Sequence, residues 1–153
     1  MSEKVILGID PGSRIAGYSL LSLKNGSPSA LDLGYLEMSS KLTIAERLAQ
    51  YDSFLNEKIT QIRVNLICLE TPFMGRNAQT FLKLGYFRGV TLLAGQKHKI
   101  GISEFAPRQV KKAVTGSGSA DKDQVARALF MMFPKISQFK KTAINDVTDA
   151  LAI

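Results

Sequence analysis

Residues 4–23, KVILGIDPGSRIAGYSLLSL, predict two neighbouring strands joined by a tight turn. The first run, residues 4–10, is rich in Val, Ile and Leu, which is typical of a buried central strand. Pro11-Gly12-Ser13 stops this run, because Pro and Gly interrupt strand pairing. The apolar pattern resumes over residues 16–23 and predicts the second strand. The chain is therefore expected to open with part of a sheet.

The next segment extends this sheet into an antiparallel meander. Residues 24–27 contain Asn-Gly, a strong signal for a hairpin turn, and residues 29–38 predict the third strand. A helix is predicted over residues 42–62, where apolar residues recur at spacings of three and four. Thr43 and Glu46 are spaced for a capping box at its start.

The remainder of the chain alternates predicted strands with predicted helices. Strands are expected at 65–70 and 100–106, helices at 77–97, 107–115, 121–133 and 143–153, and loops at 116–119 and 135–141. Three antiparallel strands followed by strands that alternate with helices indicate the α/β class. We expect a mixed five-stranded sheet flanked by helices, within a single domain over residues 1–153.

The helix predicted over 77–97 has several candidate core residues, which are Ala78, Phe81, Leu82, Val90, Leu93 and Ala94. It also carries Gly85 and Gly89, four residues apart. These glycines either permit close approach of another helix or weaken this one locally.

The composition is that of a basic globular protein. The 153 residues are 45% hydrophobic and 22% charged, and no apolar run approaches the ~20 residues of a membrane span. One Cys and one His argue against a disulfide framework and a Cys- or His-based metal site.

The net charge is +7, and residues 76–141 hold 13 Lys and Arg against 3 Asp and Glu. That basic segment either binds a nucleic acid or forms a solvated basic surface. The first residues show no signal-peptide pattern, so a cytoplasmic location is expected.

Four acids stand at positions that suit chemistry. Asp10 and Glu70 end two separate apolar strands, and Asp146 and Asp149 share one face of the last predicted helix. Ligands of α/β sheets bind beyond strand ends, so neighbouring strands would bring these acids together. Carboxylates without His or Cys prefer Mg²⁺ or Mn²⁺. Two such ions can activate water for phosphodiester hydrolysis.

A purely structural interpretation of these acids stays open. Asp10 can cap the turn that follows it. Asp146 and Asp149 can favour a helix N-terminus through the helix dipole. Neither effect explains why two buried-looking strands each end in an acid, which is costly to bury unless it is paired or bound to a metal. The metal site is therefore the preferred hypothesis.

Four segments of the chain resemble motifs of the RuvC family of Holliday junction resolvases. They are IDPGSR at 9–14 with Gly17-Tyr18 after it, LETPFM at 69–74 with Arg76-Asn77-Ala78, APRQVK at 106–111 with GSGSADK at 116–122, and DVTDALAI at 146–153. The four occur in the family's order, and the resemblance runs from residue 5 to residue 153.

This resemblance implies an RNase H-like fold, a homodimer, and metal-dependent nicking of two symmetry-related strands in a four-way DNA junction. In the family, four catalytic acids coordinate two Mg²⁺ ions per site, and Mn²⁺ can take the place of Mg²⁺. These acids are matched by Asp10, Glu70, Asp146 and Asp149. Basic positions near the family's scissile strand are matched by Arg108, Lys111 and Lys122.

Further DNA contacts are expected around these positions. Phe73 either stacks on a base of an opened junction, since the family uses an aromatic there, or folds onto the core. Arg14 follows Asp10 by four residues and either contacts a phosphate or pairs with an acid. Arg88 either contacts a phosphate or is solvated. The other predicted DNA-binding residues are Met74, Arg76 and Lys112.

The sequence leaves three other functions open. They are a YqgF-like RNA-processing nuclease, a junction-binding protein whose acids only shape the fold, and an actin-like ATPase with a phosphate loop at residues 10–13. The ATPase fold needs two such domains, and this chain supplies one. Phe73 and the spacing of Asp146 and Asp149 favour the resolvase over the RNA nuclease. No motif indicates a cleavage sequence preference or a helicase partner.

Overall fold

The computed structural model describes residues 3–72, 77–139 and 141–153, and its centre is a five-stranded sheet. The strands, in sheet order, are β3 (Ser27–Glu37), β2 (Ile15–Lys24), β1 (Lys4–Asp10), β4 (Leu66–Glu70) and β5 (Gly101–Phe105). β1, β2 and β3 pair antiparallel, whereas β4 runs parallel to β1 and β5 runs parallel to β4. The predicted mixed sheet is therefore confirmed.

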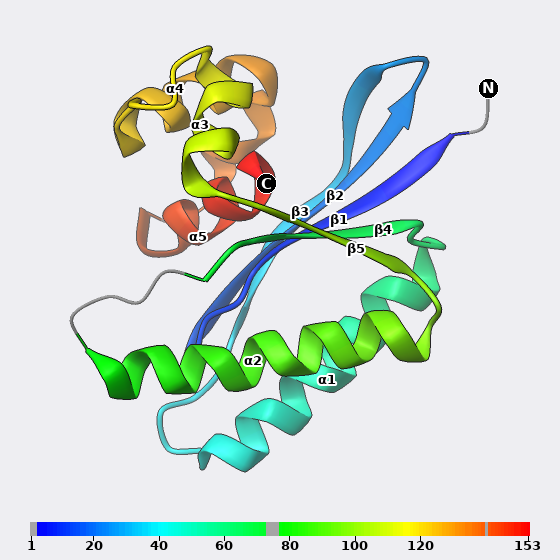
Figure 1. The fold of residues 1–153 in the computed structure, drawn as a ribbon, viewed down its shortest axis with the longest axis vertical. Helices are drawn as coiled ribbons and strands as arrows, with labels where there is room; N and C mark the ends of the chain where they lie inside the picture. The colour runs from blue at the N-terminus through cyan, green and yellow to red at the C-terminus, as the bar shows by residue number, and fades with distance from the viewer. Residues whose placement is uncertain (1–2, 73–76, 140) are drawn as a thin grey trace.

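Helices cover both faces of this sheet (Figure 1). One face carries α1 (Ile44–Gln61) and α2 (Ala78–Lys97). The other carries α5 (Lys141–Ala152), with α3 (Pro107–Thr115), α4 (Lys122–Met132) and the 3-10 helix η1 (Pro134–Gln138) beside it. At the start of α1, Thr43 and Glu46 form the predicted capping box. In the described part of the chain, no helix is long and apolar enough to cross a membrane.

Two apolar clusters hold these layers together. The larger lies between the sheet and the helices α1 and α2, and it includes Leu7, Tyr51 and Phe87, all fully buried. The smaller joins α4, η1 and α5 to the opposite face through residues such as Leu129 and Ile136. Burial of apolar surface is the main force that holds such layers in place. The second cluster therefore fixes α5 over β1 and β2.

The prediction of a loop over residues 135–141 is wrong. Pro134–Gln138 form η1, and α5 begins at Lys141. Ile136 within η1 is fully buried in the smaller cluster. Burial of this apolar side chain stabilises a short helix in a segment that also carries several basic residues.

The predicted core of the long helix is wrong for three of its residues. Ala78, at the start of α2, is exposed. Leu82 and Leu93 of α2 are 55% and 51% exposed, whereas Phe87 and Thr91 are fully buried. Apolar residues occur all round α2, so their periodicity does not identify the face that packs on the sheet. The structure leaves one apolar face of α2 open.

Candidate active site

The strand register brings two of the candidate acids to the same edge of the sheet. Ile9 on β1 lies beside Leu69 on the parallel strand β4. The residues that follow them, Asp10 and Glu70, therefore stand together where the two strands end. Both are partly buried. The carboxyl edge of parallel strands is where α/β sheets bind their ligands.

Helix α5 reaches this edge because a glycine leaves room for it. A methyl group on Gly17 would overlap the carbonyl oxygen of Asp146 on α5. Gly17 is also the register partner of Asp10 across β1 and β2. The backbone of Asp146 therefore lies against the end of β1, and its carboxylate joins the same edge.

A second close contact lies about one turn further along α5. A methyl group on Gly8 would overlap the carbonyl oxygen of Ala150. Ser19 Oγ donates a 2.9 Å hydrogen bond to the same oxygen. Neither Gly8 nor Ser19 belongs to the residues predicted for the site, although a glycine inside an apolar strand is a signal of close backbone approach. Together these contacts set the distance between α5 and the sheet.

The fourth acid lies in a pocket of about 110 Å³. Asp149 lines this pocket together with Glu70, Lys111 and Lys122. Lys122 Nζ lies 3.2 Å from Asp149 Oδ2 and donates a hydrogen bond to it. The four candidate acids therefore meet at one edge of the sheet, with lysines from α3 and α4 beside them.

A second pocket has a volume of about 330 Å³ and shares Glu70 with the first. Asp10 and Glu70 line it together with Arg88, and α2 contributes the apolar side chains of Phe81 and Leu84. The candidate site is thus a depression with two lobes. One lobe is bordered by lysines, and the other is bordered by α2.

Burial and mutual repulsion raise the pKa values of three candidate acids, Asp10, Glu70 and Asp146. Burial, with added repulsion from Asp149, Asp146 and Glu70, raises the pKa of Asp10 to about 7, although Lys122 acts to lower it. Burial followed by the charge of Asp149 raises the pKa of Glu70. Burial is also the main cause that raises the pKa of Asp146. Added positive charge therefore stabilises the ionised cluster.

The donor set suits a hard divalent cation. Carboxylate oxygens are the ligands that Mg²⁺ and Mn²⁺ prefer in proteins. Across residues 3–72, 77–139 and 141–153, however, no three His, Cys, Asp or Glu side chains are gathered tightly enough to hold an ion in the arrangement seen. The candidate acids therefore have the donor atoms and the negative charge that a divalent cation needs. Their carboxylates must move closer together to bind one.

The other predicted DNA-binding residues are spread around the site. Lys111 lines the smaller pocket, whereas Arg108 and Lys112 are exposed on α3. Arg14 is exposed and lines a separate hollow, so the structure does not bring it to the acids. Three predicted residues lie outside the described part of the chain, namely Phe73, Met74 and Arg76.

Comparison with known proteins gives one consistent match over nearly the full chain. A family model described as crossover junction endodeoxyribonuclease RuvC matches residues 6–153. The crossover junction endodeoxyribonuclease RuvC of Chlorobaculum parvum is 39% identical over 150 residues, which cover 97% of this chain and 78% of that protein.

Solved structures share the fold. Thermus thermophilus RuvC superposes with a TM-score of 0.83 at 22% identity, covering 97% of this chain and 91% of that one. The same protein in complex with a Holliday junction substrate gives a TM-score of 0.82 at 23% identity, covering 97% and 89%.

Proposed function

The chain belongs to the RuvC family of crossover junction endodeoxyribonucleases, and we propose that it resolves four-way DNA junctions by paired nicks in symmetry-related strands. The observation that carries this proposal is the convergence of four carboxylates beside Lys122 at one edge of the sheet. We assign the activity to the whole chain as a single nuclease domain, acting in DNA recombination and repair in the cytoplasm.

We assign the binding of Mg²⁺, with Mn²⁺ as a substitute and two ions per site, to Asp10, Glu70, Asp146 and Asp149. When bound, such ions activate water and stabilise the leaving oxygen in phosphodiester hydrolysis. Asp10 must lose the proton that burial and its neighbours favour, so ion binding and proton release are coupled. Lys122 must also release Asp149, and its ammonium group is then free to contact a DNA phosphate.

Basic residues of α3 and α4 are assigned to the DNA backbone. Lys111 and Lys122 line the pocket that holds Asp149, and Arg108 and Lys112 extend the positive charge along exposed α3. Such phosphate contacts position the duplex without reading its sequence. The family motifs support DNA contacts by the remaining predicted residues as well. Phe73 is assigned to stacking on a base of the opened junction and Arg14 to a phosphate, and Met74 and Arg76 complete the predicted DNA-binding set.

A single gel assay tests the activity. The purified protein is incubated with a labelled synthetic four-way junction and with a matched linear duplex, each in Mg²⁺ or in EDTA. Paired nicks are expected only in the junction and only with Mg²⁺, because the assigned site depends on the ion. An uncut junction in both Mg²⁺ and Mn²⁺ would contradict the proposal.

The same assay separates the two alternative functions. Tight junction binding without nicks in either metal would indicate a junction-binding protein whose acids are structural. If the protein shows no preference for the junction over the duplex in binding or cleavage, an RNA-processing nuclease is favoured instead. Structured RNA would then be the next substrate to test.

We propose that α2 forms the interface of a homodimer, which paired nicking requires. Leu82, Tyr86 and Leu93 share one helical face, and each is about half exposed. Gly85 and Gly89 lie on the same side of α2, and among the described residues a Cβ on either would meet no atom within 4 Å apart from the backbone of α2 itself. A second helix can therefore approach this backbone closely. An exposed apolar surface of this kind marks a protein contact, and a second copy would supply the second nicking site.

The substitution Leu93→Glu tests this interface. It places a charge in the proposed contact, so we expect the dimer dissociation constant to rise by roughly 100-fold or more. Light scattering after gel filtration should show a monomer at micromolar concentration, while circular dichroism stays unchanged. The matched control is Leu31→Glu, at an exposed leucine on β3, which should leave the dimer intact. A Leu93→Glu protein that stays dimeric would rule out the α2 interface.

A further inference from the structure

Arg88 ties α2 to the strand that carries Glu70. Its side chain is only 15% exposed. Nη1 donates a 2.8 Å hydrogen bond to the backbone carbonyl of Glu70. Nη2 lies 2.5 Å from a carboxylate oxygen of Glu104 on β5. The sequence-based expectation of a phosphate contact or a solvated side chain is therefore wrong, because Arg88 is engaged with protein groups.

These contacts hold the end of β4 from two sides. The backbone N–H of Thr71 donates a 2.9 Å hydrogen bond to the carbonyl of Phe105, which joins this end to β5. Arg88 joins the carbonyl of the preceding residue, Glu70, to α2. Anchors on two consecutive residues restrict the backbone angles there, and backbone angles determine which side-chain rotamers are allowed. The direction of the Glu70 carboxylate is therefore restricted.

The ion pair of Arg88 is made with Glu104 and not with the Glu70 carboxylate. Arg88 lines the larger pocket, yet its ion pair is with Glu104. The cations that lower the Glu70 pKa are Lys122 and Lys111. Arg88 thus contacts the backbone of Glu70 and leaves the carboxylate available to a metal ion.

We propose that Arg88 is a positioning residue that orients the Glu70 carboxylate toward the other acids of the site. The inference rests on the proposed function, since it assigns Glu70 to metal binding. Hydrogen bonds made by residues outside the ligand set orient ligands, and their loss typically costs about 10- to 100-fold in metal affinity or activity. Arg88 fits this role through a backbone contact.

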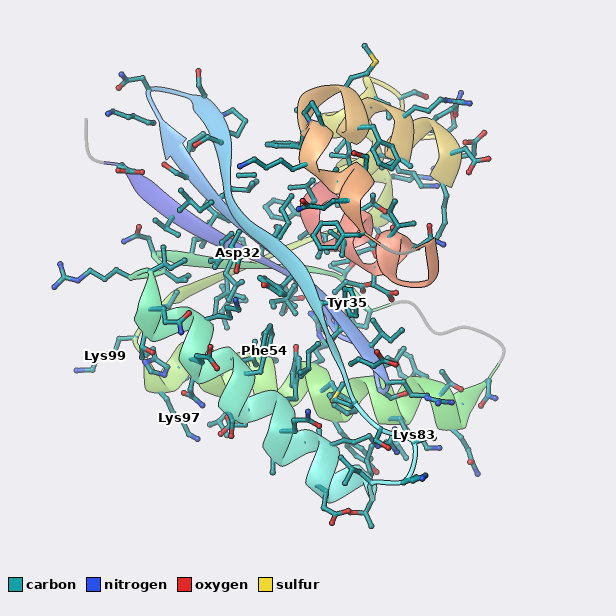
Figure 2. The ribbon with its side chains drawn as sticks, turned by 180° about the vertical axis from the view of Figure 1, so that it is seen from behind. Asp32, Tyr35, Phe54, Lys83, Lys97 and Lys99 are labelled. Carbon is teal, nitrogen blue, oxygen red and sulfur yellow. The ribbon has the colours of Figure 1, made fainter. Side chains whose placement is uncertain are left out.

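The test compares Arg88→Met, Arg88→Lys and the matched control Lys97→Met. Lys97 is an exposed cation at the C-terminal end of α2, and Figure 2 shows Lys83 toward the opposite end of the same helix. Mn²⁺ affinity is measured without DNA by electron paramagnetic resonance, and single-turnover cleavage is measured at saturating junction. Arg88→Met should weaken Mn²⁺ binding and slow cleavage by about 10- to 100-fold, with junction affinity in EDTA within about twofold. Arg88→Lys should recover part of both losses, because an ammonium group can still donate to the Glu70 carbonyl. Lys97→Met should match the wild type.

An unchanged Mn²⁺ affinity in a folded Arg88→Met protein would overturn the inference. The inference would also be overturned if Arg88→Met lowered only the fraction of molecules that are folded and active. A merely structural role would produce that result, because the Mn²⁺ midpoint of the folded molecules would then stay at the wild-type value. If Arg88→Met does not fold, Glu104→Gln replaces it. That variant removes the ion pair that fixes the guanidinium, so the hydrogen bond to the Glu70 carbonyl should weaken and the Mn²⁺ midpoint should rise. An unchanged midpoint would overturn the inference. A wild-type protein that binds Mn²⁺ but leaves the junction uncut would contradict the proposed function alone, and the Mn²⁺ affinities would still decide the role of Arg88.

Discussion

The substitution Asp10→Asn is expected to slow junction cleavage by about 10³-fold or more, with junction affinity within about twofold of the wild type. Asp10 stands where the three other candidate acids converge, and burial and their charges together raise its pKa to about 7. The amide of Asn keeps the shape of the side chain but is a weaker ligand for a divalent cation. The chemistry should therefore fail, while the basic surface that holds the DNA stays in place.

The same variant should change how the stability of the metal-free protein depends on pH. The folded protein keeps Asp10 protonated up to about pH 7, whereas the unfolded chain ionises it near pH ~4. The contribution of Asp10 to stability is therefore fully present below pH ~4 and is lost as the pH rises through 7. Asp10→Asn removes this loss, so its advantage over the wild type should grow between pH ~4 and pH ~8.

Single-turnover cleavage and urea unfolding in EDTA measure these two effects. Mg²⁺ should stabilise the wild type more than Asp10→Asn, because an ion that binds only the folded state shifts the unfolding equilibrium. Wild-type cleavage rates in the variant would remove Asp10 from the metal site. A stability difference that stays constant across this pH range would show that Asp10 does not hold its proton as proposed.

The substitution Gly17→Ala should damage both the fold and the site. The added methyl group would overlap the carbonyl oxygen of Asp146, and a backbone atom cannot rotate aside as a side chain can. Helix α5 must then move away from β2. Overpacking of this kind costs about 1–3 kcal/mol. A displacement of about 1 Å at a catalytic group can cost about 10²-fold in rate.

Urea unfolding and single-turnover cleavage of Gly17→Ala measure the two losses. The matched control is Gly101→Ala on β5, where a methyl group would meet Leu66 Cδ1 at an ordinary contact distance of 3.6 Å. The free energy of unfolding of the control should stay within about 0.5 kcal/mol of the wild-type value. If Gly17→Ala is as stable and as active as the control, the close approach of α5 is not what places Asp146.

The candidate acids are predictable from sequence because each stands in an unusual local pattern. Asp10 and Glu70 follow apolar strands, where an acid is costly unless something compensates its charge. Asp146 and Asp149 have a spacing that puts both on one helical face. The element order then places the two strands in one sheet, and the structure brings all four acids to one edge.

Other features lie beyond local patterns. Apolar residues occur on every face of α2, so the sequence pattern predicts Leu82 and Leu93 in the core. Packing against the sheet buries Phe87 instead. The contact of Gly8 with α5 joins residues more than a hundred positions apart. Arg88 looks like any surface cation until its partners on β4 and β5 are known.

The local sequence is sufficient for the order of strands and helices, the mixed sheet and the choice of four carboxylates. Each of these follows from the periodicity of apolar residues, from the spacing of acids on one helical face or from the free-energy cost of burying a charge. The open face of α2, the close seating of α5 and the anchoring of Glu70 by Arg88 come only from the folded chain. They depend on contacts between distant segments, and such contacts exist only once the layers have packed together.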